Sequence, residues 1–456
     1  MYKILDWIAS NRRLAIFLTV FIIFLLTMGL LLFLSGASKK AFQQGGAPLQ
    51  GSQLAIDLNW WVTENQALTS DSTSEIMTKF AEKYPNVKIN LTTKKDELQF
   101  IQEFLSNPDG QPDLFTVNSN NIPFYQKYAM ANQYFKNQLL GDYIERSVDT
   151  VKNNNVFSGE VYGIPMNVDN MQMYVNKNLL NNIQGVKTYA KDWETLKLQS
   201  ASFDKSKGQS LIALGSTSDL VTNYTDIIGA MMVQKGIYLD SRNKDIKDQD
   251  FIQILKDYTF FKQYLTQTQN DFDSFKQGKT LYYIDYYSAN SKLKSEAPQL
   301  DYEIVDIPKY SNGNNISHSK FYNTMAHKKF KVDPEQKKIL DDFIYFLSTE
   351  EIQKIYSDKT QLPSANRKIV EAQYKSKSDN DNNRRFFDQA IVARAILPSC
   401  PVKYKDELTS ILLSVQSKGT SPSTEELISV LTESKSKLVD SVYSENVCLP
   451  YKFCLD

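Results

Sequence analysis

Histidine and cysteine are scarce in this chain of 456 residues, which holds two histidines and three cysteines. His318 lies on a polar loop and His327 beside a lysine pair, without the spacing of a metal site. The 17 glycines form no phosphate-binding loop. Because catalysis needs a nucleophile, an acid–base pair, a metal or a phosphate cradle, we expect no enzyme and no catalytic residue, metal or cofactor. Only carboxylate pairs of the glycoside-hydrolase type stay open as an enzymatic alternative.

The three cysteines all lie near the C-terminus, at Cys400, Cys448 and Cys454. Outside the cytoplasm thiols tend to pair, so one disulfide and one free thiol are expected. Three pairings are possible. We expect a bridge between Cys448 and Cys454, which would close a short loop over "LPYKF".

Charge of one sign is not in excess, because 52 basic residues balance 52 acidic ones. This balance gives no reason to expect a nucleic acid as partner. Hydrophobic residues make up 42% and charged residues 23% of the chain, as in ordinary globular proteins. The length leaves room for two or three domains.

One long apolar run is present, "LAIFLTVFIIFLLTMGLLLFL" at residues 14–34. Its 21 residues without a charge are enough to span a bilayer as a helix. Lys3, Arg12 and Arg13 precede it, so the positive-inside rule places residues 1–13 in the cytoplasm and the bulk of the chain outside. A cleaved signal peptide is the alternative, but this run exceeds the usual apolar core of one. We therefore predict a single-pass cell-membrane protein with an extracytoplasmic binding domain.

Residues 35–53 are rich in Gly, Gln, Ser and Ala and predict a flexible tether with a reach of about 25 Å. Strand and helix patterns then alternate. "LAIDLNWW" alternates apolar and polar residues, residues 72–84 have helical spacing, and "VKINL", "DELQFIQEFL" and "PDLFTV" follow as strand, helix and strand. This order predicts an open, mostly parallel α/β sheet, in which ligands bind beyond the carboxyl ends of the strands.

Several motifs recur in an order that resembles a known family. They are "PDLFTVNSNNIPFYQKYAMANQY", "GEVYGIPMNVDNMQMYVNKNLL", "KDWETL", "FKQGKTLYYIDYYSANSKLK", "DYEIVDIPKYSNG" and "QLPSANRKI". Together they are similar to the extracellular solute-binding proteins of ABC importers, family 1, the sugar-binding group that includes maltose-binding protein. The resemblance runs from about Leu54 to Arg367, and the cysteine-containing C-terminal region lies outside it.

The resemblance implies a two-lobed periplasmic-binding-protein-like fold of type II behind a single N-terminal transmembrane helix. In this interpretation 159–163 is a turn, 164–169 an extended hinge between the lobes, and 171–180 the first helix of the second lobe. The expected parts are a cytoplasmic N-terminus (1–13), an anchor (14–34), a tether (35–53), lobe 1 (54–165 with about 281–322), lobe 2 (166–280 with about 323–441) and a cysteine-containing tail (442–456).

The resemblance also implies a ligand in the cleft between the lobes. Sugars need flat apolar faces for their C–H groups and planar polar side chains for their hydroxyls. Trp60 and Trp193 fit core positions better than a cleft. The residues we expect to bind ligand are Trp61, Asn118, Asn120, Asn167, Asp169, Tyr286, Tyr287 and Tyr322.

The leading functional hypothesis is a membrane-anchored binding protein that captures a carbohydrate and delivers it to ABC permease subunits. We expect the carbohydrate to be an oligosaccharide. It would act as a monomer. The alternative is a surface sensor or adhesion module that kept the fold without transport, and the unmatched C-terminal region motivates it.

Overall fold

The computed structural model describes residues 55–64, 70–239, 246–265, 269–329, 333–379, 381–398, 400–419 and 422–443. The expected anchor (14–34), the tether up to residue 53, and the cysteines at 448 and 454 lie outside these residues. None of the helices within them is long and apolar enough to span a bilayer. Residues Ile56–Glu82 and Val87–Asp456 form one compact unit, and the fold below is that of this unit.

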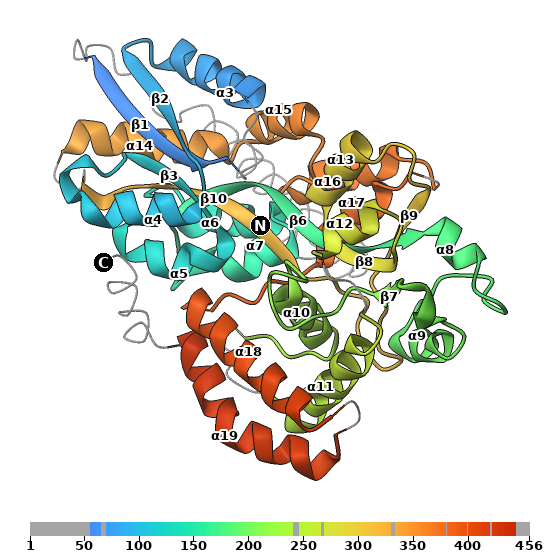
Figure 1. Cartoon of the computed structure of the whole chain (residues 1–456). Helices are drawn as coiled ribbons and strands as arrows, with labels where there is room; N and C mark the ends of the chain where they lie inside the picture. Colours follow the sequence, from blue (N-terminus) through green and yellow to red (C-terminus); the bar gives the residue numbers. More distant parts are fainter. Residues whose placement is uncertain are drawn as a thin grey trace, which may run out of the picture. The chain divides into compact units, whose positions relative to one another are not determined.

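A mixed sheet of eight strands organises the unit, in the order β2-β1-β3-β10-β6-β8-β7, with β9 also paired to β6 (Figure 1). A separate hairpin, β4-β5, turns at Gly159, whose φ of +80° suits glycine. The strands are β1 (Ile56–Thr63), β2 (Val87–Lys94), β3 (Leu114–Asn118), β4 (Val156–Phe157), β5 (Glu160–Val161), β6 (Gly163–Asn176), β7 (Ser210–Ile212), β8 (Thr280–Tyr286), β9 (Tyr302–Val305) and β10 (Ser319–Ala326).

Strand β1 lies parallel to both β2 and β3, as the strand–helix–strand pattern predicts. Beyond β3 the expectation of a mostly parallel sheet is wrong. Strand β10 runs antiparallel to β3 and β6, and β6 runs antiparallel to β8 and β9. The reason is that β6 continues from one half of the sheet into the other, so its neighbours run against it on both sides.

Strand β6 is buried along its whole length of 14 residues. Its first part, Gly163–Asn170, pairs with β10, and its second part, Met171–Asn176, pairs with β8 and β9. The helix expected from Met171 is therefore wrong up to Asn176. Met171, Met173 and Val175 recur with a period of two and pack into one core, while Tyr174 packs into another on the opposite face. The helix begins only at Lys177. Asn176 caps it, because its side chain accepts a hydrogen bond from the Leu179 N–H.

Strands β8 and β9 pair with the second part of β6, and β7 pairs with β8. The sequence assigns residues from about 281 to about 322 to the first lobe by expectation. The pairing places 280–305 in the other half of the sheet, and only β10 returns to β3. Strand patterns do not show this, because they carry no information on which neighbour a strand takes.

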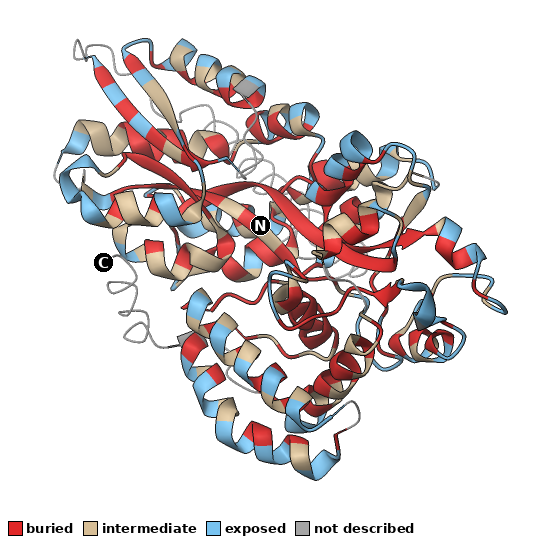
Figure 2. Cartoon of the chain, in the orientation of Figure 1, coloured by how far each residue is buried: buried red, intermediate tan, exposed pale blue. Residues whose placement is uncertain are grey.

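Helices cover both halves of the sheet, and their inward faces are buried (Figure 2). The helices are α3 (Ser70–Lys83), α4 (Glu97–Ser106), α5 (Ile122–Tyr125), α6 (Asn137–Arg146), α7 (Asp149–Asn154), α8 (Lys177–Asn181), α9 (Trp193–Ser200), α10 (Tyr224–Gln234), α11 (Asp248–Lys262), α12 (Asp271–Lys276), α13 (Tyr287–Glu296), α14 (Pro334–Leu347), α15 (Glu350–Thr360), α16 (Arg367–Ser376), α17 (Arg384–Val392), α18 (Pro401–Ser417) and α19 (Thr424–Tyr443).

Aromatic rings fill the core of the first half. Trp60 of β1 meets Phe343 of α14 edge-on at 5.6 Å, and Phe80 meets the same ring at 4.9 Å. In the second half, α10, α11, α18 and α19 join β7 and β8 in one continuous core. The C-terminal helices are thus integral to the second half. All of these core elements lie between residues 56 and 443, so a chain that starts at residue 55 contains the whole of the core that the structure describes.

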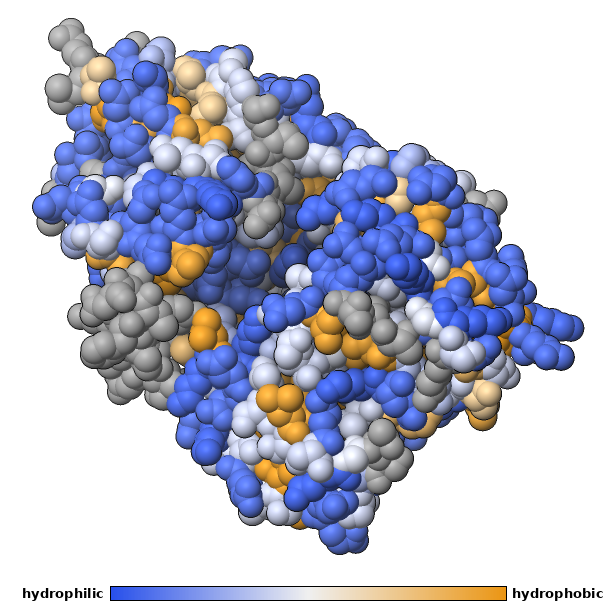
Figure 3. All heavy atoms as spheres, in the orientation of Figure 1, coloured by the Kyte–Doolittle hydropathy of each residue, from blue (hydrophilic) through white to orange (hydrophobic). Residues whose placement is uncertain are grey.

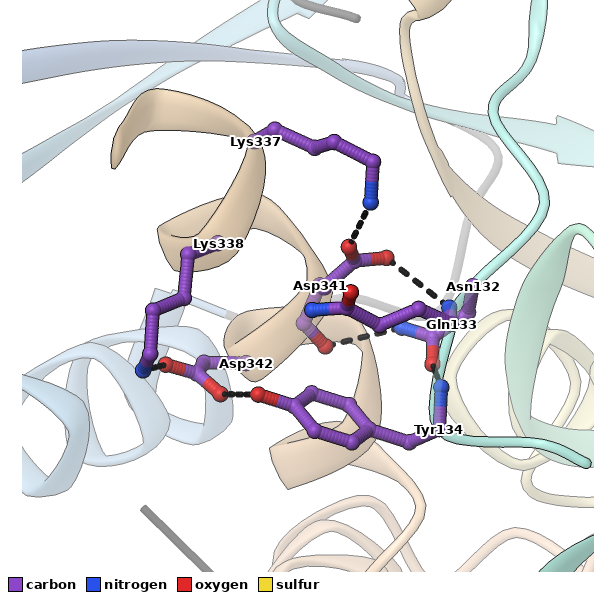
Figure 4. A network of polar contacts seen from close by, with 7 residues as sticks. All are labelled: Asn132, Gln133, Tyr134, Lys337, Lys338, Asp341 and Asp342. Atoms are coloured by element: carbon purple, nitrogen blue, oxygen red, sulfur yellow. Dashed lines mark hydrogen bonds and ion pairs between the residues drawn. The ribbon is translucent and has the colours of Figure 1, made fainter. Parts of the chain in front are cut away.

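A polar network fixes α14 to the segment after α5 (Figure 4). The Asp341 carboxylate, whose side chain is 0% exposed, pairs with Lys337 and accepts the Gln133 N–H at 3.2 Å. Asp342 accepts the Tyr134 hydroxyl at 2.5 Å. Burial raises the pKa of Asp341, and its pairing with Lys337 opposes that rise.

Cys400, immediately before α18, is buried and disulfide-bonded. Only two other cysteines, Cys448 and Cys454, exist in the chain. A bridge between those two would leave Cys400 unpaired, so the expected pairing is wrong. Three cysteines allow one disulfide within the chain, and Cys400 is one of its two residues.

Candidate functional site

A cavity of about 380 Å³ opens between the two halves of the unit. Figure 3 shows this face hollowed between the region of α4 and that of α10 and α18. The first half contributes Glu97, Leu98, Ile101, Asn120 and Asn121, and the second half contributes Thr225, Asp226, Gly229, His318, Ile396, Pro398, Pro401, Val402, Tyr404 and Lys405.

A chain of hydrogen bonds holds Asp226 in the cavity wall. The Tyr286 hydroxyl donates to Asp226 Oδ2 at 2.7 Å and lies 3.0 Å from His318 Nδ1. On the other side of the ring, His318 Nε2 accepts the Ile396 N–H at 3.4 Å. Because Nε2 accepts, a neutral ring carries its proton on Nδ1 and donates it to the tyrosine oxygen. Burial lowers the pKa of His318, which keeps the ring neutral.

Gly229 makes room for this chain. A Cβ atom at Gly229 would lie 2.9 Å from Cδ2 of His318, closer than real Cβ contacts allow. Asp226 sits in the first turn of α10, where the helix dipole favours a negative charge. Its carboxylate is thus an acceptor that Tyr286 holds in place and that lines the cavity.

Two short elements build the opposite wall. Asp96 caps α4 by accepting the Gln99 N–H at 2.8 Å, which places Glu97 in the first turn. Asn121 Nδ2 donates to Glu97 at 2.5 Å. Burial raises the pKa of Glu97 to about 7, although the hydrogen bond from Asn121 opposes the rise.

Asn118 and Asn120 act as a pair. Asn118 Oδ1 accepts the Asn120 N–H at 3.0 Å at the start of the 3-10 helix η2 (Ser119–Asn121). This bond orients Asn120, whose Oδ1 atom is buried at the cavity without a hydrogen-bond partner. A buried amide oxygen in that state is an unsatisfied acceptor in the cavity wall.

Of the other residues expected to bind ligand, three lie where β6, β8 and α13 meet. Asp169 is buried and accepts the Tyr287 N–H at 2.8 Å, so it caps α13. Burial raises the pKa of Asp169 to about 6, while the charge of Lys320 opposes the rise. Tyr287 packs edge-on against Phe386 at 5.0 Å. Tyr286, described above, holds Asp226.

Like Asp169, Tyr286 and Tyr287, the remaining three residues are not among those that line the cavity. Trp61 lies between Phe100, 5.8 Å away, and the Lys94 ammonium, 3.8 Å above its ring. Asn167 accepts the Tyr356 hydroxyl at 3.3 Å. Tyr322 is in register with Asn118 across β10 and β3.

Lys320 introduces a cation beside Tyr286, with its ammonium 3.5 Å from the ring centroid. Burial acts to lower the pKa of Lys320, but the acidic side chains around it, including Asp169, Asp226 and Asp285, outweigh burial and raise it. Lys320 therefore brings one ammonium close to a group of carboxylates, of which Asp226 lines the cavity.

Sequence reasoning missed Asp226, Glu97 and His318. Asp226 is an acidic residue on a helix whose following positions, "IIGAMMVQ", are all buried, and this contrast was the available signal. His318 gave none, because its role depends on Tyr286 and Ile396, both distant in sequence.

A family model for bacterial extracellular solute-binding proteins matches residues 75–382, more than half of the chain. The chain belongs to this family. It is therefore a solute-binding protein and not an enzyme. No curated protein matches it in sequence.

Solved structures show the same fold at low identity. The cyclic alpha-maltosyl-1,6-maltose binding protein from Arthrobacter globiformis aligns with a TM-score of 0.69 and 13% identity over 84% of this solute-binding protein and 99% of that chain. The sugar-binding protein MalE from Xanthomonas citri aligns at 0.64 and 14% over 88% and 100%. An ABC substrate-binding protein from Listeria monocytogenes, in complex with cycloalternan, aligns at 0.63 and 15% over 84% and 98%. The two-lobed α/β fold is thereby confirmed.

Proposed function

We propose that this solute-binding protein captures a carbohydrate, an oligosaccharide, in the cavity between its lobes and delivers it to the permease subunits of an ABC transporter. The observation that carries the proposal is the pair of hydrogen-bonding groups that face one cavity from opposite walls, Asp226 and Asn120. A carboxylate and an amide oxygen accept bonds from sugar hydroxyls. The similar structures named above bind maltosyl sugars and cycloalternan, which supports this ligand class.

The proposal includes the surroundings of the protein. Residues 14–34 anchor it in the cell membrane as a single pass, residues 35–53 tether it, and the binding domain works outside as a monomer. Protease added to intact, wall-stripped cells should then digest the domain. Mature protein that starts near residue 38 would contradict the anchor.

Calorimetry on residues 55–456 tests ligand capture with maltose, maltotriose, maltotetraose and mannotriose. At least one should bind saturably. Asp226→Asn should weaken that binding roughly 10-fold, because a charge-assisted hydrogen bond is lost. Asp219→Asn is the matched control, since Asp219 is exposed just before the same helix. Absence of saturable heat with every saccharide, or equal affinity of Asp226→Asn and parent, would refute the proposal.

A further inference from the structure

Two exposed apolar side chains line the cavity from opposite walls. Leu98 of α4 is 57% exposed and Val402 of α18 is 45% exposed. Single exposed apolar side chains are common on protein surfaces, but a pair at one cavity is a feature of binding sites. In Figure 3 apolar surface borders the hollow on both sides.

The core does not require either residue. On α4 the buried positions are Phe100 and Phe104, one turn apart, whereas Leu98 and Ile101 are three apart and share another face. On α18 the core side chains start at Tyr404 and Leu408, and Val402 lies off that face, beside the cavity. Each helix thus has a second apolar position with no partner in the core.

The cavity has a less exposed polar part and an exposed apolar part. His318 is 2% exposed, and Asp226 and Asn120 are half-buried. Leu98 and Val402 are the most exposed lining residues, and Ile101 and Pro401 add half-buried apolar surface. A ligand that matches both parts has a polar end and an apolar end.

The apolar lining is aliphatic. Among the described lining residues the only tyrosine, phenylalanine or tryptophan is Tyr404, which is 6% exposed and directs its hydroxyl to the Met232 sulfur. The expected aromatic Trp61 is committed to Lys94 and Phe100. A flat sugar face therefore finds no open ring here, whereas a flexible alkyl or acyl chain finds branched side chains on two walls.

From these observations we infer that the ligand is a carbohydrate with an apolar substituent, an alkyl or acyl glycoside, whose chain lies between Leu98 and Val402. The inference rests on the proposed function and narrows its ligand class. Wall α18 lies beyond the residues that the family model matches, so this specificity belongs to the C-terminal region of the present chain.

The test compares maltose with n-octyl-β-D-maltoside, below its micelle-forming concentration, by calorimetry on residues 55–456. Four proteins are measured: parent, Leu98→Asn, Val402→Asn and Leu413→Asn. Leu413 is the matched control, because it is 50% exposed on α18 but does not line the cavity. All three positions are exposed, so each variant should keep the parent's melting temperature.

In the parent and in Leu413→Asn the octyl glycoside should bind roughly 10-fold more tightly than maltose, because part of its chain leaves water. In Leu98→Asn and Val402→Asn this advantage should fall below about 3-fold. Equal affinity of both sugars in the parent, or an unchanged advantage in both variants, overturns the inference and leaves the proposed function standing. Octyl maltoside could bind in a way that depends on Val402 while free saccharides do not bind at all. That result supports the inference and counts against capture of free oligosaccharides. Failure of both probes overturns the inference, and the saccharide panel then decides the proposed function separately.

Discussion

The Tyr286 hydroxyl lies 2.7 Å from Asp226 Oδ2, so this buried tyrosine holds in place a carboxylate that lines the cavity. Tyr286 is the last residue of β8, and Asp226 is in the first turn of α10. The sequence predicted Tyr286 as a ligand contact, and the structure gives it a positioning contact.

Tyr286→Phe removes this hydroxyl and keeps the ring. A hydrogen bond to a charged group contributes about 1.5 kcal/mol, so ligand affinity should fall roughly 10-fold while the fold persists. Calorimetry with the saccharide that binds best measures the change. Tyr287→Phe is the control, because that ring packs on Phe386 and lies outside the cavity lining. Parent-like affinity of Tyr286→Phe would show that Asp226 needs no support.

Glu97 should make stability depend on pH. Burial raises its pKa from the ordinary value of 4.5 to about 7. A raised carboxyl pKa means that the folded state prefers the protonated form, so its contribution is complete below pH 4.5 and is lost as the pH rises through about 7. Glu97→Gln removes the ionisation. The variant should gain about 1–2 kcal/mol relative to the parent between these pH values, measured by urea unfolding. A difference that stays constant with pH would contradict this assignment.

The buried ion pair of α14 should matter more than a similar exposed pair on α15. Lys337–Asp341 and Lys354–Asp358 both have i,i+4 spacing, but the Asp341 side chain is 0% exposed and that of Asp358 is 61% exposed. Asp341→Ala should cost about 2–3 kcal/mol of unfolding free energy, because it removes both acceptor oxygens and leaves the Gln133 N–H and the Lys337 ammonium without this partner. Asp358→Ala should cost less than about 0.5 kcal/mol. Similar losses for both would show that the Figure 4 network contributes little.

Trp61→Ala separates packing from binding. Its ring lies between Lys94 and Phe100, so the substitution should lower the unfolding free energy by about 2 kcal/mol. The ligand affinity of the folded variant should stay within about 2-fold of the parent's. A loss of affinity without a loss of stability would show that Trp61 contacts the ligand.

The bridge at Cys400 is open to direct chemistry. Non-reducing peptide mapping should find Cys400 linked to a peptide that contains Cys448 or Cys454, and one free thiol. Cys400→Ser should lower the unfolding free energy by about 2–4 kcal/mol. A Cys448–Cys454 cross-link with a free Cys400 would contradict a bridge at Cys400.

The sequence predicts local elements well where one face is buried. Ile56, Leu58 and Trp60 alternate with exposed residues along β1, and this pattern is enough to identify the strand. It fails for Met171 to Asn176, where both faces are buried and polar residues such as Gln172 are internal. Sheet partners of β8 and β9 are likewise not encoded in their own patterns.

The cavity was predictable only in part. Asn120 was expected because it follows a strand, and it does line the cavity. Glu97, Asp226 and His318 line the same cavity from segments that are far apart in the sequence, and this arrangement depends on tertiary packing. The aliphatic contribution of α18 had no signal, because Val402 resembles any exposed apolar residue on a helix.

The cavity wall is assembled from stretches at 97–101, 120–121, 225–229, 318 and 396–405. A molecule that fills it therefore acts as a non-covalent cross-link between the start and the end of the folded chain. Binding to the native state alone raises stability by mass action. Cleavage by an added protease between α17 and α18 should slow as cargo is loaded, so that the rate of nicking reports occupancy even before the cargo is identified.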